Sequence, residues 1–222
     1  MKPTSKDIRK LAGVSLFSRI PSDLLSETID RFGGGVREYG GGEVIFSPLA
    51  DAPQVGVLLS GRAAVSTPSE TRSVLLRFLS AGDAFGISNL FSEERFVSLI
   101  RTETACRCFL LSQEAIGHLL DHSPEFRRAY VGFLSDRVRF LNRKIGYLTA
   151  GSAERRLALY LASLGEGEVR LQDSITSLSD LLNLGRASLY RAFDRLCEDG
   201  FLIRNGRNLT ILDREAMLRA YK

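Results

Sequence analysis

Residues 174–204 read SITSLSDLLNLGRASLYRAFDRLCEDGFLIR and contain the patterns of two short amphipathic helices. The first pattern places three leucines on one helical face, and the second, over residues 186–197, places apolar side chains at i, i+4 and i+7. Between them lies Asn183-Leu184-Gly185, a short polar turn that ends in glycine. Such a turn between two helices is typical of helix-turn-helix units, so the stretch predicts one.

The second predicted helix carries arginines and short side chains outside its apolar face. Arg186, Ala187, Ser188 and Arg191 lie on or near this outer face. Arginine can hold guanine with two hydrogen bonds in the major groove of DNA, and a helix with short residues between its arginines fits that groove. DNA binding is therefore one interpretation, and an ordinary helical hairpin inside a globular core is the other.

A β-hairpin is predicted directly after the second helix. Two β-prone runs flank Asn205-Gly206, a pair in which both residues tolerate positive φ. Helix, turn, helix and hairpin together form the winged version of the motif. Arg204 and Arg207 flank the hairpin tip, where we expect them to reach DNA phosphates.

The composition of the 222-residue chain, 44% hydrophobic and 25% charged, is that of a globular protein with a sizeable core. No apolar run approaches the roughly 18 residues of a membrane span, and the N-terminus lacks the apolar core of a signal peptide. We therefore expect a cytoplasmic protein without a membrane partner. Residues 151–222 hold 11 Lys and Arg against 10 Asp and Glu, so DNA affinity would depend on where the arginines lie rather than on bulk charge.

Residues 33–111 contain short β-rich runs between glycine and polar turns, at a spacing of about 8 to 12 residues. The runs cover residues 36–39, 43–46, 55–59, 62–66, 73–79, 96–102 and 106–111. This spacing predicts a compact β-domain of the sandwich, roll or barrel type. Helical patterns precede it at residues 5–31 and follow it from Ser112.

A long helix is predicted from Ser123-Pro124 to about Leu148. Its apolar residues step alternately by three and four positions, which is a heptad pattern. The heptad residues are Val131, Leu134, Val138, Leu141, Ile145 and Leu148. The helix could pack on its own β-domain, but a sustained heptad favours a partner helix, so we expect homodimerisation through these residues.

Helix-breaking residues at 149–151 and a capping serine at 152 separate the long helix from the rest of the chain. The predicted domains are therefore residues 1–122, a β-domain with N-terminal helices, residues 123–149, the dimerisation helix, and residues 152–222, the winged unit.

Cysteine and histidine form no metal-binding pattern. Cys106, Cys108 and Cys197 fit no zinc spacing, and we expect the first two to be buried apolar residues, with a redox-sensing pair as the alternative. His118 and His122 have a spacing that can hold a metal on a helix, but no third ligand is evident beyond Asp121. We predict neither a metal site nor catalytic residues.

Four segments in this order resemble the Crp/Fnr superfamily of bacterial transcription regulators. They are LLSGRAAV (58–65), LSAGDAFGISNLFSE (79–93), ETACRCFLLS (103–112) and LSDLLNLGRASLYRAFDRLCEDGFLI (178–203). The resemblance covers nearly the whole chain. It implies an α+β fold with an N-terminal double-stranded β-helix (a jelly-roll-like β-roll), a long dimerisation helix and a C-terminal winged helix-turn-helix.

The resemblance also implies that the second helix of the motif reads a two-fold symmetric DNA site. Arg186, Ala187, Ser188 and Arg191 stand at the family's contact positions. The commonest family pattern has glutamate where this chain has Ala187, and alanine cannot accept a hydrogen bond from cytosine. We therefore expect the operator to differ at that base pair, with about 1–3 kcal/mol of discrimination at stake.

The family's effector pocket is implied at Gly86, Ile87 and Ser88, at Val97 and Ser98, and at Leu141 and Asn142. Cyclic-nucleotide binders in the family use a Gly-Glu pair and an Arg-Ser or Arg-Thr pair there. This chain has Ile87 for the glutamate and Val97 for the arginine, so the charge-assisted bonds to ribose and phosphate are lost. Cyclic AMP is therefore not the expected effector, and the effector and any cofactor stay unidentified.

The prediction is thus a homodimeric DNA-binding transcription regulator whose partners are palindromic double-stranded DNA, a second copy, a small-molecule effector and RNA polymerase. A cupin-like enzyme is an alternative, but it needs histidines on the roll and none precedes His118. The second alternative is a ligand-binding protein whose winged unit contacts another protein, which would lack salt-dependent binding to generic DNA.

Overall fold

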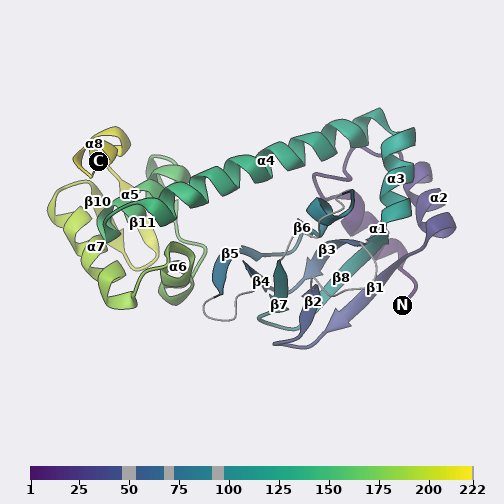
Figure 1. Cartoon of the computed structure of the whole chain (residues 1–222), viewed down its shortest axis with the longest axis horizontal. Helices are drawn as coiled ribbons and strands as arrows, with labels where there is room; N and C mark the ends of the chain where they lie inside the picture. Colours follow the sequence, from purple (N-terminus) through teal and green to yellow (C-terminus); the bar gives the residue numbers. More distant parts are fainter. Residues whose placement is uncertain (47–53, 68–72, 92–97, 222) are drawn as a thin grey trace. The chain divides into compact units, whose positions relative to one another are not determined.

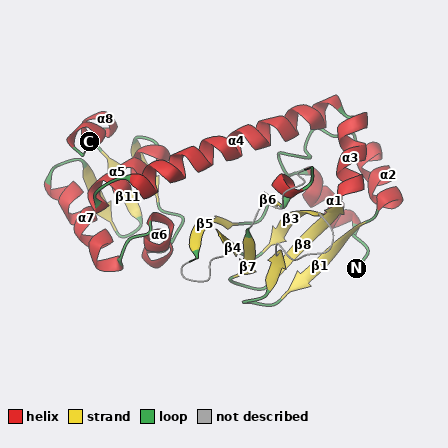
Figure 2. Ribbon diagram, viewed as in Figure 1, coloured by secondary structure: helices red, strands yellow, loops and turns green. Residues whose placement is uncertain are grey.

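The computed structural model describes residues 1–46, 54–67, 73–91 and 98–221. The chain divides into two compact units, residues 1–137 and 138–222, and each has its own buried apolar core. Helices and antiparallel sheets occur in both units (Figures 1 and 2), so the α+β prediction is confirmed. The predicted three-part division of the chain stays a prediction.

The first unit is a β-roll covered by helices. Its helices are α1 (Ser5–Ala12), α2 (Ser22–Phe32), the short 3-10 helix η1 (Ile87–Asn89), α3 (Gln113–His122) and the start of α4 (Pro124–Thr149). Its strands are β1 (Gly34–Tyr39), β2 (Val44–Phe46), β3 (Gln54–Ser60), β4 (Ala63–Thr67), β5 (Val74–Leu79), β6 (Ala84–Phe85), β7 (Leu99–Thr102) and β8 (Cys106–Ser112). Among the described residues of this unit, β6 and η1 are the elements that the sequence patterns did not predict.

The strands form two four-stranded antiparallel sheets, in the orders β1-β8-β3-β6 and β2-β7-β4-β5. All five residues from Val55 to Leu59 are buried, as a strand in the middle of a roll requires. Because β3 pairs with β6, the backbone of Gly56 lies against the ring of Phe85. The predicted run 96–102 corresponds to β7, and residues 96 and 97 lie outside the described part of the chain.

Serine caps begin the helices that follow the roll. The Ser112 hydroxyl accepts a hydrogen bond from the Ala115 N–H at 3.1 Å and starts α3. The Ser123 hydroxyl accepts one from the Phe126 N–H at 3.1 Å, and Pro124 follows at the first helical position, where proline is favoured. Both predicted helix starts are confirmed, and α4 continues to Thr149 as one helix.

The second unit contains the end of α4 and the winged motif. Its further elements are α5 (Ala153–Leu164), β9 (Gly167–Arg170), α6 (Ile175–Leu182), α7 (Arg186–Glu198), β10 (Leu202–Asn205), β11 (Asn208–Ile211) and α8 (Arg214–Ala220). The strands form one antiparallel sheet in the order β10-β11-β9. The predicted helix-turn-helix and hairpin are confirmed.

One detail of the hairpin prediction is wrong. Asn205 pairs with Asn208, so the two central turn residues are Gly206 and Arg207 rather than Asn205 and Gly206. Gly206 has φ +61°, and Asn205 is an ordinary strand residue. A turn with glycine at its first central position needs positive φ there, which explains the shift by one residue.

None of the helices in the described segments is both long and apolar enough to cross a membrane.

Replacement of Gly56 by alanine should destabilise the roll, since a Cβ at Gly56 would overlap the Phe85 ring. Overpacking of this kind costs about 1–3 kcal/mol, so the urea midpoint of unfolding should fall. Gly117→Ala is the control, because a Cβ at Gly117 in α3 meets open space. An unchanged midpoint in Gly56→Ala would contradict the packing described.

Candidate nucleic-acid interface and effector region

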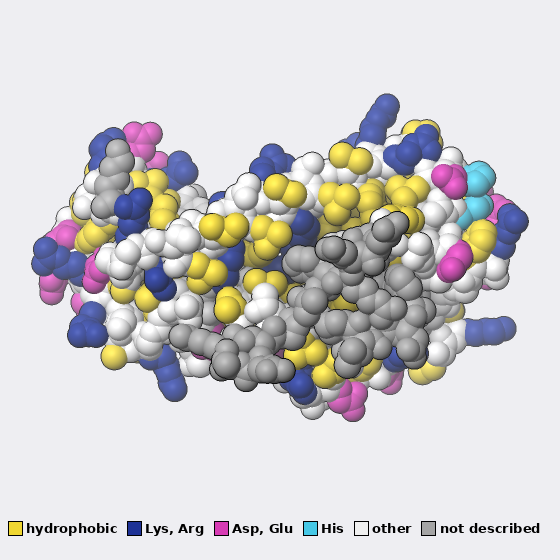
Figure 3. Space-filling view, in the orientation of Figure 1, with side chains coloured by type: hydrophobic (Ala, Val, Ile, Leu, Met, Phe, Trp, Pro, Cys, Tyr) yellow, Lys and Arg dark blue, Asp and Glu magenta, His cyan; other side chains and the backbone are white. Residues whose placement is uncertain are grey.

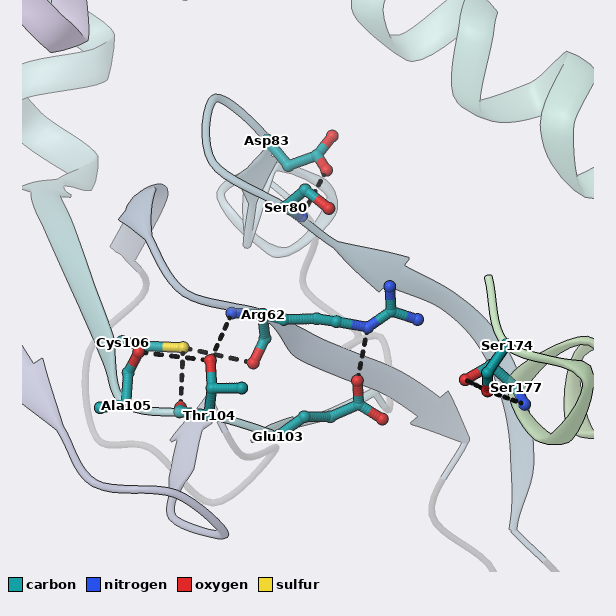
Figure 4. A network of polar contacts seen from close by, with 9 residues as sticks. All are labelled: Arg62, Ser80, Asp83, Glu103, Thr104, Ala105, Cys106, Ser174 and Ser177. Atoms are coloured by element: carbon teal, nitrogen blue, oxygen red, sulfur yellow. Dashed lines mark hydrogen bonds and ion pairs between the residues drawn. The ribbon is translucent and has the colours of Figure 1, made fainter. Parts of the chain in front are cut away.

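The turn of the helix-turn-helix is fixed by its own backbone bonds. Asn183 adopts the left-handed conformation, with φ 51° and ψ 49°, directly after α6. The Leu184 N–H donates to the Ser179 carbonyl at 2.9 Å, and the Asn183 N–H donates to the Asp180 carbonyl at 3.2 Å. This pair of bonds is a Schellman motif, which asparagine can close because it tolerates positive φ. At the other end of α6, Ser174 caps the helix through the Ser177 N–H at 3.0 Å (Figure 4).

Two cations hold the carbonyl end of α6 from outside. The Lys144 ammonium on α4, 2% exposed, donates to the Leu181 carbonyl. Arg156 on α5 donates to the carbonyls of Leu182 at 3.4 Å and Asn183 at 3.2 Å. Positive side chains at a helix C-terminus satisfy its free carbonyls and its dipole. The sequence patterns did not identify either cation, because neither has a fixed spacing from α6.

The predicted contact residues of α7 lie opposite its buried face. Leu189, Ala192, Phe193 and Leu196 are fully buried, together with Leu178 and Leu182 of α6. Arg186, Ala187 and Arg191 are exposed, and Ser188 is half-buried. The Arg191 guanidinium donates to the Ser188 hydroxyl at 3.3 Å. The four predicted positions therefore share one solvent-facing surface at the start of α7.

Arg204 on β10 lies against α7, next to the rings of Phe193 and Tyr190. Its guanidinium carbon is 4.3 Å from the centre of the Phe193 ring and 5.3 Å from that of the Tyr190 ring. Its Nε also donates to the Gly206 carbonyl at 3.4 Å, while Arg207 is exposed in the turn. These cation–π contacts fix the direction of the Arg204 side chain. The sequence patterns missed Tyr190, which is 45% exposed between Leu189 and Arg191 on the same helix.

The residues predicted for the effector pocket have different environments. Gly86 has φ +81°, and a Cβ there would meet the Gln54 carbonyl, so glycine is required. Ile87 is 4% exposed and belongs to the apolar core of the roll, where its carbonyl accepts a hydrogen bond from the Tyr130 hydroxyl at 3.3 Å. Ser88 is exposed and Ser98 half-buried.

Three further pocket residues were predicted away from this segment. Val97 lies outside the described residues. Leu141 and Asn142 are exposed on α4 and belong to the second unit. Their role as pocket residues stays a prediction.

A polar network in the roll connects Arg62 with Glu103, Thr104 and Cys106 (Figure 4). The Arg62 Nε lies 2.6 Å from a Glu103 carboxylate oxygen, and the Arg62 N–H donates to the Thr104 hydroxyl at 3.0 Å. Cys106 and Cys108 are buried on the same face of β8. Burial raises the pKa of both thiols, to about 12 at Cys108. Since the reactive species is the thiolate, this environment does not favour the redox alternative.

The histidine pair packs as part of the helical cover. His118 and His122 stack with their ring centres 4.2 Å apart, and the Thr28 hydroxyl lies 3.0 Å from the His118 Nδ1. No group of three His, Cys, Asp or Glu side chains suited to a metal occurs within the described ranges.

Two family models match the chain in the order of its two units. Residues 36–123 match the cyclic nucleotide-binding domain, and residues 155–220 match the Crp-like helix-turn-helix domain. The chain belongs to the Crp/Fnr superfamily. It is therefore a DNA-binding transcription regulator, and the function expected from α7 is confirmed at that level.

Relatives of this Crp/Fnr regulator agree with the assignment. The chain is 25% identical over 185 residues to the probable transcriptional regulator flp of Lacticaseibacillus casei, covering 82% of this chain and 84% of that protein. The fold is similar to that of a variant of CooA from Carboxydothermus hydrogenoformans, with a TM-score of 0.75, 19% identity and coverage of 99% and 97%. It is also similar to the c-di-GMP responsive regulator CLP of Xanthomonas campestris, with a TM-score of 0.61, 24% identity and coverage of 85% and 99%.

Lys144 should make stability depend on pH. Burial lowers the pKa of its ammonium from 10.5 to about 8. Because the folded pKa lies below the unfolded one, the unfolded chain binds the additional proton between these values. The contribution of Lys144 to the free energy of unfolding should therefore increase from pH 8 to pH 10.5, by at most about 3 kcal/mol.

The measurement is urea unfolding of the wild type and of Lys144→Met across this pH window. Methionine does not titrate, so the difference between the two proteins isolates the lysine from the tyrosines and cysteines that ionise in the same range. A difference that stays constant with pH would contradict the lowered pKa.

Proposed function

We propose that this regulator is a homodimer that reads a palindromic DNA site with α7 and is controlled through its β-roll by an effector other than cyclic AMP. The observation that carries the proposal is the two-sided character of α7. One side is fully buried in the core of the second unit, and the other presents Arg186, Ala187, Ser188 and Arg191 to solvent.

The chemistry of the exposed side fits the major groove. Two arginines supply paired donors for guanine, while Ala187 and Ser188 are short enough to let the helix approach the bases. Ala187 offers a methyl contact, which favours a thymine methyl over a cytosine amine. We therefore expect the operator to depart from sites read by a glutamate at this position.

The hairpin of β10 and β11, the wing of the motif, supports an orientation in which α7 enters the major groove. Arg204 is stacked on α7, and Arg207 is exposed at the hairpin turn, so both can reach the backbone beside the groove that α7 enters. Phosphate contacts of this kind fix the register of a protein on DNA without reading sequence. They matter here because residues 151–222 hold 11 Lys and Arg against 10 Asp and Glu and so carry little net charge.

The heptad residues of α4 support a homodimer. Val131, Val138 and Ile145 are about 60% exposed, and Leu141 is 36% exposed. Figure 3 shows hydrophobic side chains in a row over this helix. A partner helix with the same heptad would cover them, and two-fold symmetry would place two α7 helices about 34 Å apart, one turn of DNA.

The environment of Ile87 argues against cyclic AMP. The position of the ribose-binding glutamate holds Ile87, whose side chain is buried in the apolar core rather than offered to a ligand. A different effector would act by shifting the population of dimer arrangements in which the two α7 helices match the operator. RNA polymerase as a partner and a cytoplasmic location belong to the same proposal.

Contact of the winged unit with another protein is the competing function. It predicts no salt-dependent binding to DNA, whereas an arginine-based interface loses affinity steeply as salt rises.

Arg186→Ala and Arg191→Ala should each weaken binding to a selected palindromic site by about 1–3 kcal/mol, since each removes a two-bond contact to a base. Gel-shift titrations with the selected site and with unrelated DNA would measure the loss. Arg219→Ala on α8 is the control, because its guanidinium pairs with Glu215 on the same short helix. Equal affinity of all four proteins for the site would rule out α7 as the reading helix.

Val138→Asp should dissociate the dimer, because a carboxylate in a paired heptad would be buried without a partner. Sedimentation velocity at several protein concentrations gives the mass directly. The control is Arg143→Asp, an exposed residue on the side of α4 away from the heptad residues. A wild-type monomer, or an unchanged dimer in Val138→Asp, would refute the proposed interface.

A further inference from the structure

One flank of the exposed surface of α7 carries a tyrosine. Successive residues of a helix are separated by about 100°, so Ala187 and Arg191 lie opposite the buried face, and Ser188 lies beside Arg191. Tyr190 lies on the other flank, one turn after Arg186. Its side chain is 45% exposed, and its hydroxyl has no hydrogen-bond partner within the described residues. This phenol is therefore available to a partner outside the chain.

The strand β10 contacts this flank of α7 through Arg204. The guanidinium carbon of Arg204 lies 4.3 Å from the centre of the Phe193 ring and 5.3 Å from that of the Tyr190 ring. Phe193 is fully buried in the core of the second unit, so its ring is held in place. These ring contacts fix the guanidinium and the phenol relative to each other.

Arg204 keeps hydrogen-bond donors after it has made these contacts. A guanidinium has five N–H groups in its plane, whereas aromatic rings contact its face. The Nε–H donates to the Gly206 carbonyl at 3.4 Å, and no ion pair in the described ranges includes Arg204. The N–H groups of its two terminal nitrogens therefore remain for an anion, next to the donor of the Tyr190 hydroxyl.

We propose that Arg204 and Tyr190 together bind one phosphate of the DNA backbone, beside the groove that α7 enters. Phosphate oxygens accept hydrogen bonds from arginine and from tyrosine hydroxyls, and the arginine bonds are charge-assisted. The distance of 5.3 Å between the guanidinium carbon and the ring centre places both groups within reach of the same phosphate. The inference rests on the proposed function, in which α7 enters the major groove.

The position of Tyr190 on α7 favours a phosphate over a base. Bases are reached by the N-terminal residues of a recognition helix and by the side chains opposite its buried face, while its flanks face the backbones that form the walls of the groove. Tyr190 is one turn beyond Arg186 and next to the wing. A phosphate bound there would connect α7 with β10, so that helix and wing would bind DNA as one surface.

The test is a fluorescence-anisotropy titration of the full-length protein with the selected palindromic site and with unrelated DNA of the same length, at several sodium chloride concentrations. Tyr190→Phe keeps the ring contact with Arg204 and removes only the hydroxyl. Its Kd should rise about tenfold for both DNAs, because the phosphate is present in every sequence. The dependence of log Kd on log salt should not change, since the hydroxyl is neutral.

Arg204→Gln should also raise the Kd for both DNAs, and the salt slope should fall by about 1, because one cation fewer pairs with the backbone. The double variant should lose less affinity than the product of the two single losses, since both groups bind the same phosphate. Arg219→Gln, which removes an exposed positive charge on α8, is the control and should bind like the wild type. Circular dichroism checks the folding of each variant.

Arg204→Lys provides a second variant if Arg204→Gln fails to fold. It keeps the charge and loses the planar group that stacks on the rings, so it should bind both DNAs more weakly with an unchanged salt slope.

A loss in Tyr190→Phe that is confined to the palindromic site would mean that Tyr190 reads a base, and an unchanged Kd would mean that it does not touch DNA. Either result overturns the inference. Single losses that multiply in the double variant would place the two groups on separate phosphates and overturn it as well. The proposed function fails separately, when Arg186→Ala and Arg191→Ala leave the Kd for the palindromic site unchanged.

Discussion

Helix α4 contributes side chains to the core of the roll, to the core of the winged unit and to an exposed heptad between them. The rest of the structure depends on this one continuous helix. Phe126 and Tyr130 from its first turns enter the core of the roll, and Tyr147 near its end enters the core of the winged unit. Between these positions the heptad residues Val131, Val138, Leu141 and Ile145 remain exposed. Because successive residues of a helix are separated by about 100°, buried, exposed and polar positions can alternate along it without a break.

Positive charge at the end of α6 supports the turn before α7. Lys144 and Arg156 have carbonyl partners at the end of α6, so their charge offsets the dipole of a helix and fixes the turn before α7. Burial disfavours the charge of Lys144 and lowers its pKa, while the Leu181 carbonyl accepts a hydrogen bond from its ammonium.

The exposed side of α7, which we propose reads DNA, results from the burial of its opposite side. The apolar face of α7 packs against α6 in the core of the second unit, so its polar face is presented outward. The hairpin adds Arg204, whose stacking on Phe193 connects the wing to the helix. The contact between Arg204 and α7 requires the strand register of the hairpin, because a shift by one residue would turn the arginine to the other face of the sheet.

The sequence by itself determined a compact β-domain, the long helix, the helix-turn-helix and its outward residues, because repeating apolar positions and capping serines are local signals, and the resemblance to the Crp/Fnr superfamily implied that the β-domain is a roll. Only the tertiary structure decided which long-range partners meet, Lys144 with Leu181 and Arg156 with Asn183. Local patterns also placed the hairpin turn one residue early, since strand pairing rather than turn propensity sets its register. Periodicity specifies which face of an element is buried, but the partner of a buried charge is chosen by packing between segments far apart in the chain.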